Sequence, residues 1–353
     1  VLPPDERLLL WATDLPSFYY ACKVTPERAA RNQFTRRVPL AGMEELAAVQ
    51  EYRARLRAGE VGSPDYGVLC LNSLAMGDLN ATGFAQAGHR RLLESVDALP
   101  PELAYYAPCP RADVLGGVMI DDFVLAAFVP LEQGAGERSS AQKRAEALFA
   151  RARAAYAAAG VPDVEKKRVV AADEATAWGC QVRGREGVAG SALAKRAALA
   201  ALTGAIAASG VGNGPLLATV QGMWVDALLY RRAALALLAA LPIFVVEFGE
   251  DPRPRTLPGE VVSELWGLVA VAPLLETNLR AQVAPTLTAC DASLEGGGAC
   301  TAAVPPPAAR ELWRFRGRPG AAPVLGARGL CFGGEIAEAL PWKTKAMWRW
   351  RRR

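Results

Sequence analysis

The sequence predicts an α+β fold, and three observations support this. Two apolar runs, Val114 to Ile120 and Phe123 to Val129, flank Asp121-Asp122, which is the pattern of a β-hairpin. Ala141 to Ala159 is an Ala-rich amphipathic segment that ends at Gly160, as helices commonly do. Hydrophobic residues make up 52% and charged residues 22% of 353 residues, which argues against a disordered chain or a fibrous repeat.

The remaining elements are predicted from local patterns along the chain. A strand-like apolar run begins at Arg7 and closes at Asp14, and a basic cluster at 166–168 precedes a short strand from Ala177 to Val182. Ala-rich helices fill most of 191–241. The apolar run Ala233 to Val246 is interrupted by Pro242 and is shorter than the roughly 20 residues of a bilayer span, so we expect a buried helix followed by a strand.

The last third of the chain begins with a linker. Asp251 to Pro258 contains three prolines in eight residues. After it we expect a helix at Glu260–Val271, a strand at Thr286–Cys290 that ends in Asp291, a loop at 304–330 and a final basic helix at 335–353.

Cysteine spacing and charge narrow the function classes. Seven cysteines never form a C-x-x-C pair, which excludes a zinc ribbon and favours a reducing compartment, cytoplasmic or nuclear. The first ten residues contain Asp5 and Glu6 and lack Met, so we expect a fragment of a longer chain and no signal peptide. Residues 310–353 hold eleven Lys or Arg and three Asp or Glu, which suits either a polyanion partner or a solvated tail.

The most informative chemical feature is the Asp121-Asp122 pair. Adjacent carboxylates between apolar strands are costly unless a cation or water neutralises them. Asp14 closes the first apolar run, so it could meet the hairpin tip from a neighbouring strand. Three carboxylates from two strands can hold two hard cations, an arrangement that serves in-line phosphoryl transfer. A solvated Asp-rich turn is the simpler alternative.

These acids lie in segments that resemble the motifs of reverse transcriptases. DLPSFYY from Asp14 resembles the first catalytic motif, and VMIDDFV resembles the aromatic-x-Asp-Asp hairpin. Ala75 to Gln86 (AMGDLNATGFAQ) resembles the template- and substrate-positioning segment. Lys167 and, twelve residues later, Gly179 resemble the later lysine and the primer-gripping hairpin.

A further segment resembles a second domain of the same polyproteins. LTACDASLEGGGAC, which contains Asp291, resembles the opening strand of the ribonuclease H-like domain, and Gly334-Glu335 resembles its second acidic element. Polymerase followed by connection and ribonuclease H is the order in retrotransposon polyproteins, particularly the tyrosine-recombinase, DIRS-like group.

The resemblance implies an architecture of three parts. Residues 1–190 would form a reverse-transcriptase palm, an antiparallel sheet backed by helices with its fingers largely missing. Residues 191–255 would form a helical thumb or connection. Residues 256–353 would form a connection and a truncated, partial ribonuclease H-like α/β domain.

The resemblance also implies roles for individual residues. Tyr19 would exclude a 2′ hydroxyl, Gly77 and Gln86 would line the template and nucleotide site, and Lys167 would protonate or neutralise the leaving pyrophosphate. The partners would be an RNA template, a DNA primer and deoxynucleoside triphosphates, with no membrane. The implied Mg²⁺ (or Mn²⁺) ligands are Asp14, Asp121 and Asp122 in the polymerase site, and Asp291 and Glu335 (with Glu338 as the alternative to Glu335) in the ribonuclease site.

Departures from the family pattern leave other interpretations open. Met119 stands where the family usually has an aromatic residue, and Thr82 where it usually has proline. A degenerate or repurposed remnant would bind nucleic acid without polymerising, so enzymatic activity is left open. A structural Ala-rich scaffold is a third interpretation. Tyr19 could simply be a core aromatic, Lys167 part of a solvated turn, and His89 is expected to be exposed.

Overall fold

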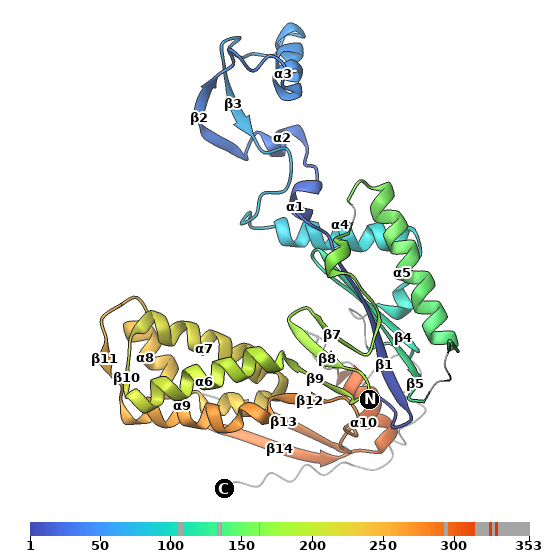
Figure 1. Cartoon of the computed structure of the whole chain (residues 1–353), viewed down its shortest axis with the longest axis vertical. Helices are drawn as coiled ribbons and strands as arrows, with labels where there is room; N and C mark the ends of the chain where they lie inside the picture. Colours follow the sequence, from blue (N-terminus) through green and yellow to red (C-terminus); the bar gives the residue numbers. More distant parts are fainter. Residues whose placement is uncertain are drawn as a thin grey trace.

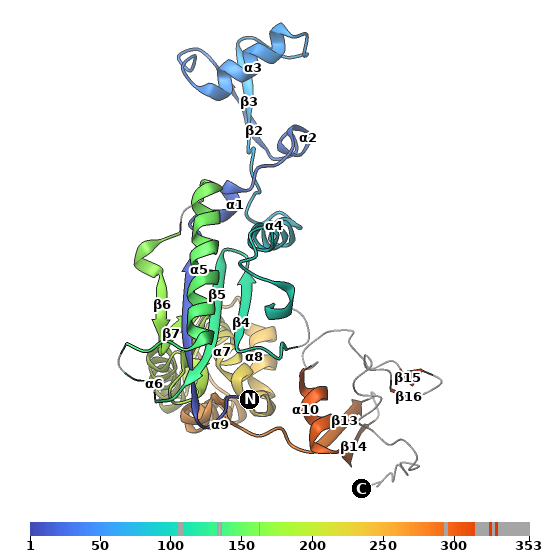
Figure 2. The ribbon, with the colours of Figure 1, turned by 90° about the vertical axis from the view of Figure 1, so that its right-hand side faces the viewer.

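A four-stranded antiparallel sheet forms the centre of the N-terminal half. Its strand order is β4 (Val114–Met119), β5 (Asp122–Pro130), β1 (Glu6–Asp14) and β6 (Val169–Ala172). Figure 1 labels the first three strands, and Figure 2 labels β6. The computed structural model describes residues 1–104, 109–132, 134, 136–161, 163–292, 296–314, 325–326 and 329–330. The predicted β-hairpin and the strand that closes at Asp14 are confirmed.

Helices α4 (Ala81–Ser95) and α5 (Ser140–Ala158) cover one face of this sheet (Figure 2). Along β5 every second side chain is buried, from Phe123 to Val129, because successive residues of a strand point to opposite faces. Trp11 of β1 is also fully buried in this core. The predicted helix at 141–159 is confirmed as α5, which begins after Ser139, whose hydroxyl accepts from the Gln142 amide.

The opposite face of the sheet receives an aromatic side chain at Gly117. A Cβ built there would lie 2.4 Å from the Trp178 ring, so the indole contacts the backbone of β4 directly. Gly116 faces the core instead, where a Cβ would lie 2.6 Å from Leu99. Because Gly116 and Gly117 have no Cβ, Leu99 and Trp178 can approach the backbone of β4 closely from the two faces of the sheet.

Trp178 belongs to a second antiparallel sheet, with strand order β12 (Glu276–Asn278), β9 (Val188–Ser191), β8 (Cys180–Arg183) and β7 (Glu174–Ala177). The prediction of one strand from Ala177 to Val182 is wrong. Trp178 and Gly179 have φ values of 51° and 72°, and two consecutive positive φ values make the tight turn of a hairpin.

A helical layer encloses a second core around Trp224 and Leu265. Its elements are α6 (Leu193–Ser209), α7 (Gly214–Leu228), η3 (Leu229–Leu237), α8 (Ala240–Phe248) and α9 (Gly259–Val271). The predicted strand after Pro242 is wrong, because that segment is helix α8. The Glu264 carboxylate of α9 accepts from the Ala240 and Leu241 amides at 2.6 and 2.8 Å and so caps this helix.

In the part of the chain that the structure describes, no single helix has the length and hydrophobicity to cross a membrane. One helix pair, Gly214–Leu237 with Ala240–Phe248, passes that test by length and composition only and is bent by 101°.

An extension projects from the sheet between β1 and α4 (Figures 1 and 2). It contains α2 (Pro26–Ala29), β2 (Gln33–Pro39), α3 (Ala47–Arg57) and β3 (Tyr66–Cys70), and β2 pairs with β3. No local pattern in the sequence predicted these elements. An ion pair between Arg28 and Asp78 joins its base to the turn before α4.

The C-terminal part contains β13 (Thr286–Ala292), paired with β14 (Gly297–Ala303), and α10 (Pro306–Arg314). The predicted strand before Asp291 and the helix at 260–271 are confirmed. The predicted helix at 335–353 lies outside the described residues. The short elements are α1 (Phe18–Ala21), η1 (Pro101–Leu103), η2 (Glu165–Lys167), η4 (Ala272–Leu274), β10 (Val211–Gly212), β11 (Arg255–Thr256), β15 (Leu325–Gly326) and β16 (Gly329–Leu330).

We expect the first core to be sensitive to truncation at Leu125, which is fully buried on β5. Leu125→Ala should lower the free energy of unfolding by about 2–5 kcal/mol, because it removes buried methyl groups and leaves a cavity. Val170→Ala on β6, where the side chain is 58% exposed, is the control and should cost about 0.5 kcal/mol or less. Urea unfolding followed by circular dichroism measures both, and equal effects would contradict this account of the core.

Candidate functional site

The three predicted aspartates lie together at one end of the first sheet. Asp14 is the last residue of β1, and the antiparallel register places it directly opposite Asp122, the first residue of β5. Asp121 lies in the turn that joins β4 to β5. The Leu15 amide donates to the Asp121 carbonyl at 3.1 Å, which ties this turn to the end of β1.

The electrostatics of this end of the sheet are unfavourable for three charges. Partial burial, together with the neighbouring carboxylates of Asp121 and Asp14, raises the pKa of Asp122 to about 6. The Lys167 ammonium opposes this shift. Because neighbouring carboxylates repel one another when ionised, a cation bound between them would stabilise this cluster.

Lys167 forms an ion pair with Asp14. It lies in the short helix η2, and the Val164 amide just before η2 donates to the Asp14 carbonyl at 3.1 Å. Asp14 holds the pKa of the exposed lysine above its ordinary value. Because 65% of the Lys167 side chain is exposed, this ammonium can leave Asp14 at little cost.

Asp163, which the sequence analysis did not single out, anchors the segment that carries Lys167. Its nearly buried carboxylate accepts from Arg168 at 2.6 and 3.1 Å and from the Thr13 hydroxyl at 3.0 Å. Thr13 immediately precedes Asp14, so Asp163 links the 163–168 segment to the end of β1 that carries Asp14. Because Asp163 lies 150 residues after Thr13 in the sequence, no local pattern predicted this contact.

The turn before the aspartate pair has an unusual backbone. Ile120 has a φ of 56°, a left-handed conformation that β-branched residues rarely adopt. Its amide donates to Gln86 Oε1 at 2.7 Å, and Gln86 Nε2 donates to the Val118 carbonyl at 2.8 Å. Gln86 therefore braces the hairpin, while its predicted place in the template and nucleotide site stays a prediction.

The prediction that His89 is exposed is wrong, since its side chain is fully buried between the hairpin and α5. Its Nδ1 lies 2.8 Å from the Ile120 carbonyl, and its Nε2 lies 2.8 Å from the Tyr156 hydroxyl. Burial lowers the pKa of His89 to about 4, so the ring is neutral at pH 7. A sequence signal was present, because the buried face of α4 recurs every four residues, at Ala81, Ala85, His89 and Leu93.

The two remaining predicted residues of the polymerase site flank α4. Tyr19 is half-buried on α1, and its hydroxyl lies 3.2 Å from that of Thr82, at the start of α4. Gly77 lies in the turn before α4 with a φ of 89°, which glycine adopts without strain. Their predicted contacts with a nucleotide remain predictions.

Metal coordination is not formed in this conformation. Within the described ranges, no group of three or more His, Cys, Asp or Glu side chains is arranged to hold a metal ion. Asp291 lies on β13, opposite Gly298 in a separate two-stranded sheet, and Glu335 and Glu338 lie outside the described residues. The hard oxygen ligands at the end of the first sheet still suit Mg²⁺ by their chemistry and charge.

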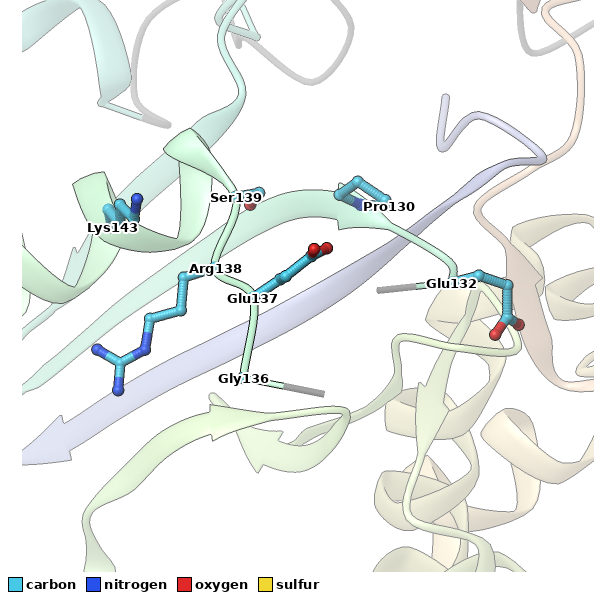
Figure 3. A pocket seen from close by; sticks show the side chains of 7 residues that line it. All are labelled: Pro130, Glu132, Gly136, Glu137, Arg138, Ser139 and Lys143. Atoms are coloured by element: carbon cyan, nitrogen blue, oxygen red, sulfur yellow. The ribbon is translucent and has the colours of Figure 1, made fainter. Parts of the chain in front are cut away.

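A surface hollow of about 490 Å³ lies away from these acids (Figure 3). Pro130, Glu132, Arg138 and Lys143 line part of it. Pro130 ends β5, whereas Asp122 begins it, so the hollow and the aspartates lie at opposite ends of this strand. The three aspartates therefore do not line this hollow.

No family model and no curated protein matches this sequence. Among solved structures, the chain is similar to the foamy viral protease-reverse transcriptase in complex with double-stranded DNA, at 14% identity and a TM-score of 0.44, over 84% of this chain and 48% of that one. The dRH form of that protein with double-stranded DNA gives 13% identity and a TM-score of 0.45, over 84% and 40%. Its complex with an RNA/DNA hybrid gives 13% and 0.48, over 84% and 31%.

This chain thus spans from about a third to about half of the length of these proteins.

The buried His89 predicts a specific pH dependence of stability. A folded-state pKa of about 4, below the ordinary 6.5, means that the unfolded chain binds the additional proton first as pH falls. His89 should therefore cost the folded state nothing above pH 6.5 and about 3 kcal/mol near pH 4.

The measurement is the free energy of unfolding of the wild type and of His89→Leu, from urea titrations between pH 4 and 7. The raised pKa of Asp122 gives a slope of opposite sign. Asp122→Asn is therefore introduced into both proteins, so that the difference between them isolates His89. A difference that does not change with pH would contradict the assignment.

Proposed function

We propose that this chain is the polymerase part of a reverse transcriptase, which extends a DNA primer along an RNA template with deoxynucleoside triphosphates. The observation that carries the proposal is the β1–β5 register, which sets Asp14 opposite Asp122 with Asp121 in the adjoining turn. Three carboxylates on two neighbouring strands suit a pair of divalent cations in nucleotidyl transfer.

The three carboxylates would hold Mg²⁺ or Mn²⁺, which supplies charge neutralisation and alignment of the reacting phosphate. Two features support this assignment. The pKa of Asp122 is raised by burial and by its acidic neighbours, and a cation, Lys167, already pairs with Asp14. When released from Asp14, Lys167 would be free to neutralise the leaving pyrophosphate. Tyr19, half-buried beside α4, would exclude a 2′ hydroxyl.

The finer assignments are part of the same proposal. Residues 1–190 would be the palm, 191–255 a thumb or connection, and 256–353 a connection with part of a ribonuclease H-like domain, in which Asp291 and Glu335 would bind metal. A DIRS-like retrotransposon origin stays a prediction of the motif order. The alternative, a remnant that binds nucleic acid without catalysis, is favoured by the Asp14–Lys167 pair and by carboxylates that do not yet form a metal site.

We expect divalent cations to bind at the three aspartates. Calorimetric titration with Mn²⁺ should show affinity weakened about tenfold or more in Asp121→Asn, because one charged ligand becomes neutral. Asp113→Asn is the matched control and should bind as the wild type does. Asp113 immediately precedes the first residue of β4, at the opposite end of that strand from Asp121. If Asp121→Asn and the wild type gave identical isotherms, the three acids would not form a cation site.

We expect the wild type to extend a DNA primer on an RNA template in the presence of Mg²⁺. Asp122→Asn should reduce extension by about 10²-fold or more, since it removes charge that acts at the reacting phosphate. Extension that survives Asp122→Asn would reject the proposal. Filter binding of the same template–primer, without extension by the wild type, would favour the remnant instead.

A further inference from the structure

Two helices hold the backbone of one turn residue. The Ile120 amide donates to Gln86 of α4, and the Ile120 carbonyl lies 2.8 Å from His89, one helical turn further along α4. Tyr156 of α5 holds the far side of the His89 ring at 2.8 Å. Both polar backbone groups of Ile120 are therefore bound by side chains from outside the sheet.

Ile120 needs such support because of its conformation. At a φ of 56° its branched side chain crowds the backbone, and a residue in this region persists only when its surroundings hold it there. Ile120 immediately precedes Asp121 and Asp122. If it relaxed to negative φ, the following peptide would rotate and carry both aspartates with it.

The chemistry of the contact defines the state of His89. A carbonyl oxygen only accepts hydrogen bonds, so Nδ1 carries the proton and donates to Ile120. Nε2 of the neutral ring is then the acceptor, and the Tyr156 hydroxyl donates to it. The rings of Phe18 and Tyr156 lie 5.2 and 5.4 Å from the His89 ring, centroid to centroid, and restrict its orientation.

We infer that His89 is a positioning residue: through the Ile120 carbonyl it keeps the turn 119–122 in the conformation that places Asp121 and Asp122 beside Asp14. It touches neither substrate nor cation, and Tyr156 keeps its ring in place. The consequence for cation binding rests on the proposed function, whereas the effect on the turn does not.

The first test measures the turn itself, through hydrogen exchange of the Ile120 amide. His89→Leu retains bulk but has no donor. Without the bond to the Ile120 carbonyl the turn should open more readily, and the Ile120–Gln86 bond breaks when it opens, so this exchange should accelerate about tenfold. His89→Asn, whose amide can occupy the place of Nδ1, should keep the exchange rate close to that of the wild type. Ala87→Leu, an exposed change on the same helix, is the matched control and should have no effect.

A second variant separates positioning from general destabilisation. Glycine adopts positive φ freely, so in Ile120→Gly the turn no longer needs the hydrogen bond from His89 to offset backbone strain. The effect of His89→Leu should therefore be much smaller in the Ile120→Gly background than in the wild type. An equal effect in both backgrounds would overturn the inference. Tyr156→Phe, which removes only the hydroxyl, should give a partial acceleration and serves if His89→Leu does not fold.

The third measurement is Mn²⁺ affinity, which links the turn to the proposed site. His89→Leu should weaken Mn²⁺ binding about tenfold or more, and His89→Asn should restore it. Unchanged exchange and unchanged affinity in folded His89→Leu, or equal losses in the Leu and Asn variants, would overturn the inference. If the wild type itself bound no Mn²⁺, the proposed function would fail, and the exchange measurements would still decide whether His89 holds the turn.

Discussion

The antiparallel pairing of β1 with β5 is the constraint on which the candidate site depends. The two strands pair without interruption from Glu6 opposite Pro130 to Asp14 opposite Asp122. A shift of one residue would move the buried side chains of β5 to the half-exposed face, so the core holds this register strongly. The position of the carboxylates is therefore a consequence of hydrophobic packing several residues away.

Bringing these acids together is opposed by their mutual repulsion, and the surrounding structure offsets it from several sides. Lys167 supplies a positive charge to Asp14, and Asp163 holds the segment from which Lys167 extends. On the other side, α4 binds the turn before the aspartates through Gln86 and His89. The segments that hold the site thus come from two separate stretches of the chain, 163–168 and α4, both distant in sequence from the aspartates.

The second half of the molecule is attached to this sheet at both ends of β1. Near the end that carries the aspartates, Trp178 of the second sheet lies against Gly117 of β4. Near the start of β1, Arg280 donates to the Glu6 carbonyl at 2.8 Å, and the Leu2 amide donates to the Leu279 carbonyl at 2.7 Å. These contacts explain why β12, at 276–278, joins a sheet whose other strands lie about ninety residues earlier.

The sequence by itself determined the features that depend on neighbouring residues. Alternating apolar runs around Asp121-Asp122 specify the hairpin, and an Ala-rich run that ends at Gly160 specifies α5, because period and turn chemistry are local. The remaining features depend on tertiary contacts. His89 is buried because α4 packs on the sheet beside α5, which places the His89 ring between the hairpin and Tyr156. Helix α8, which contains Pro242, begins where Glu264, more than twenty residues later, caps it. Such contacts join residues distant in sequence, so no local pattern encodes them.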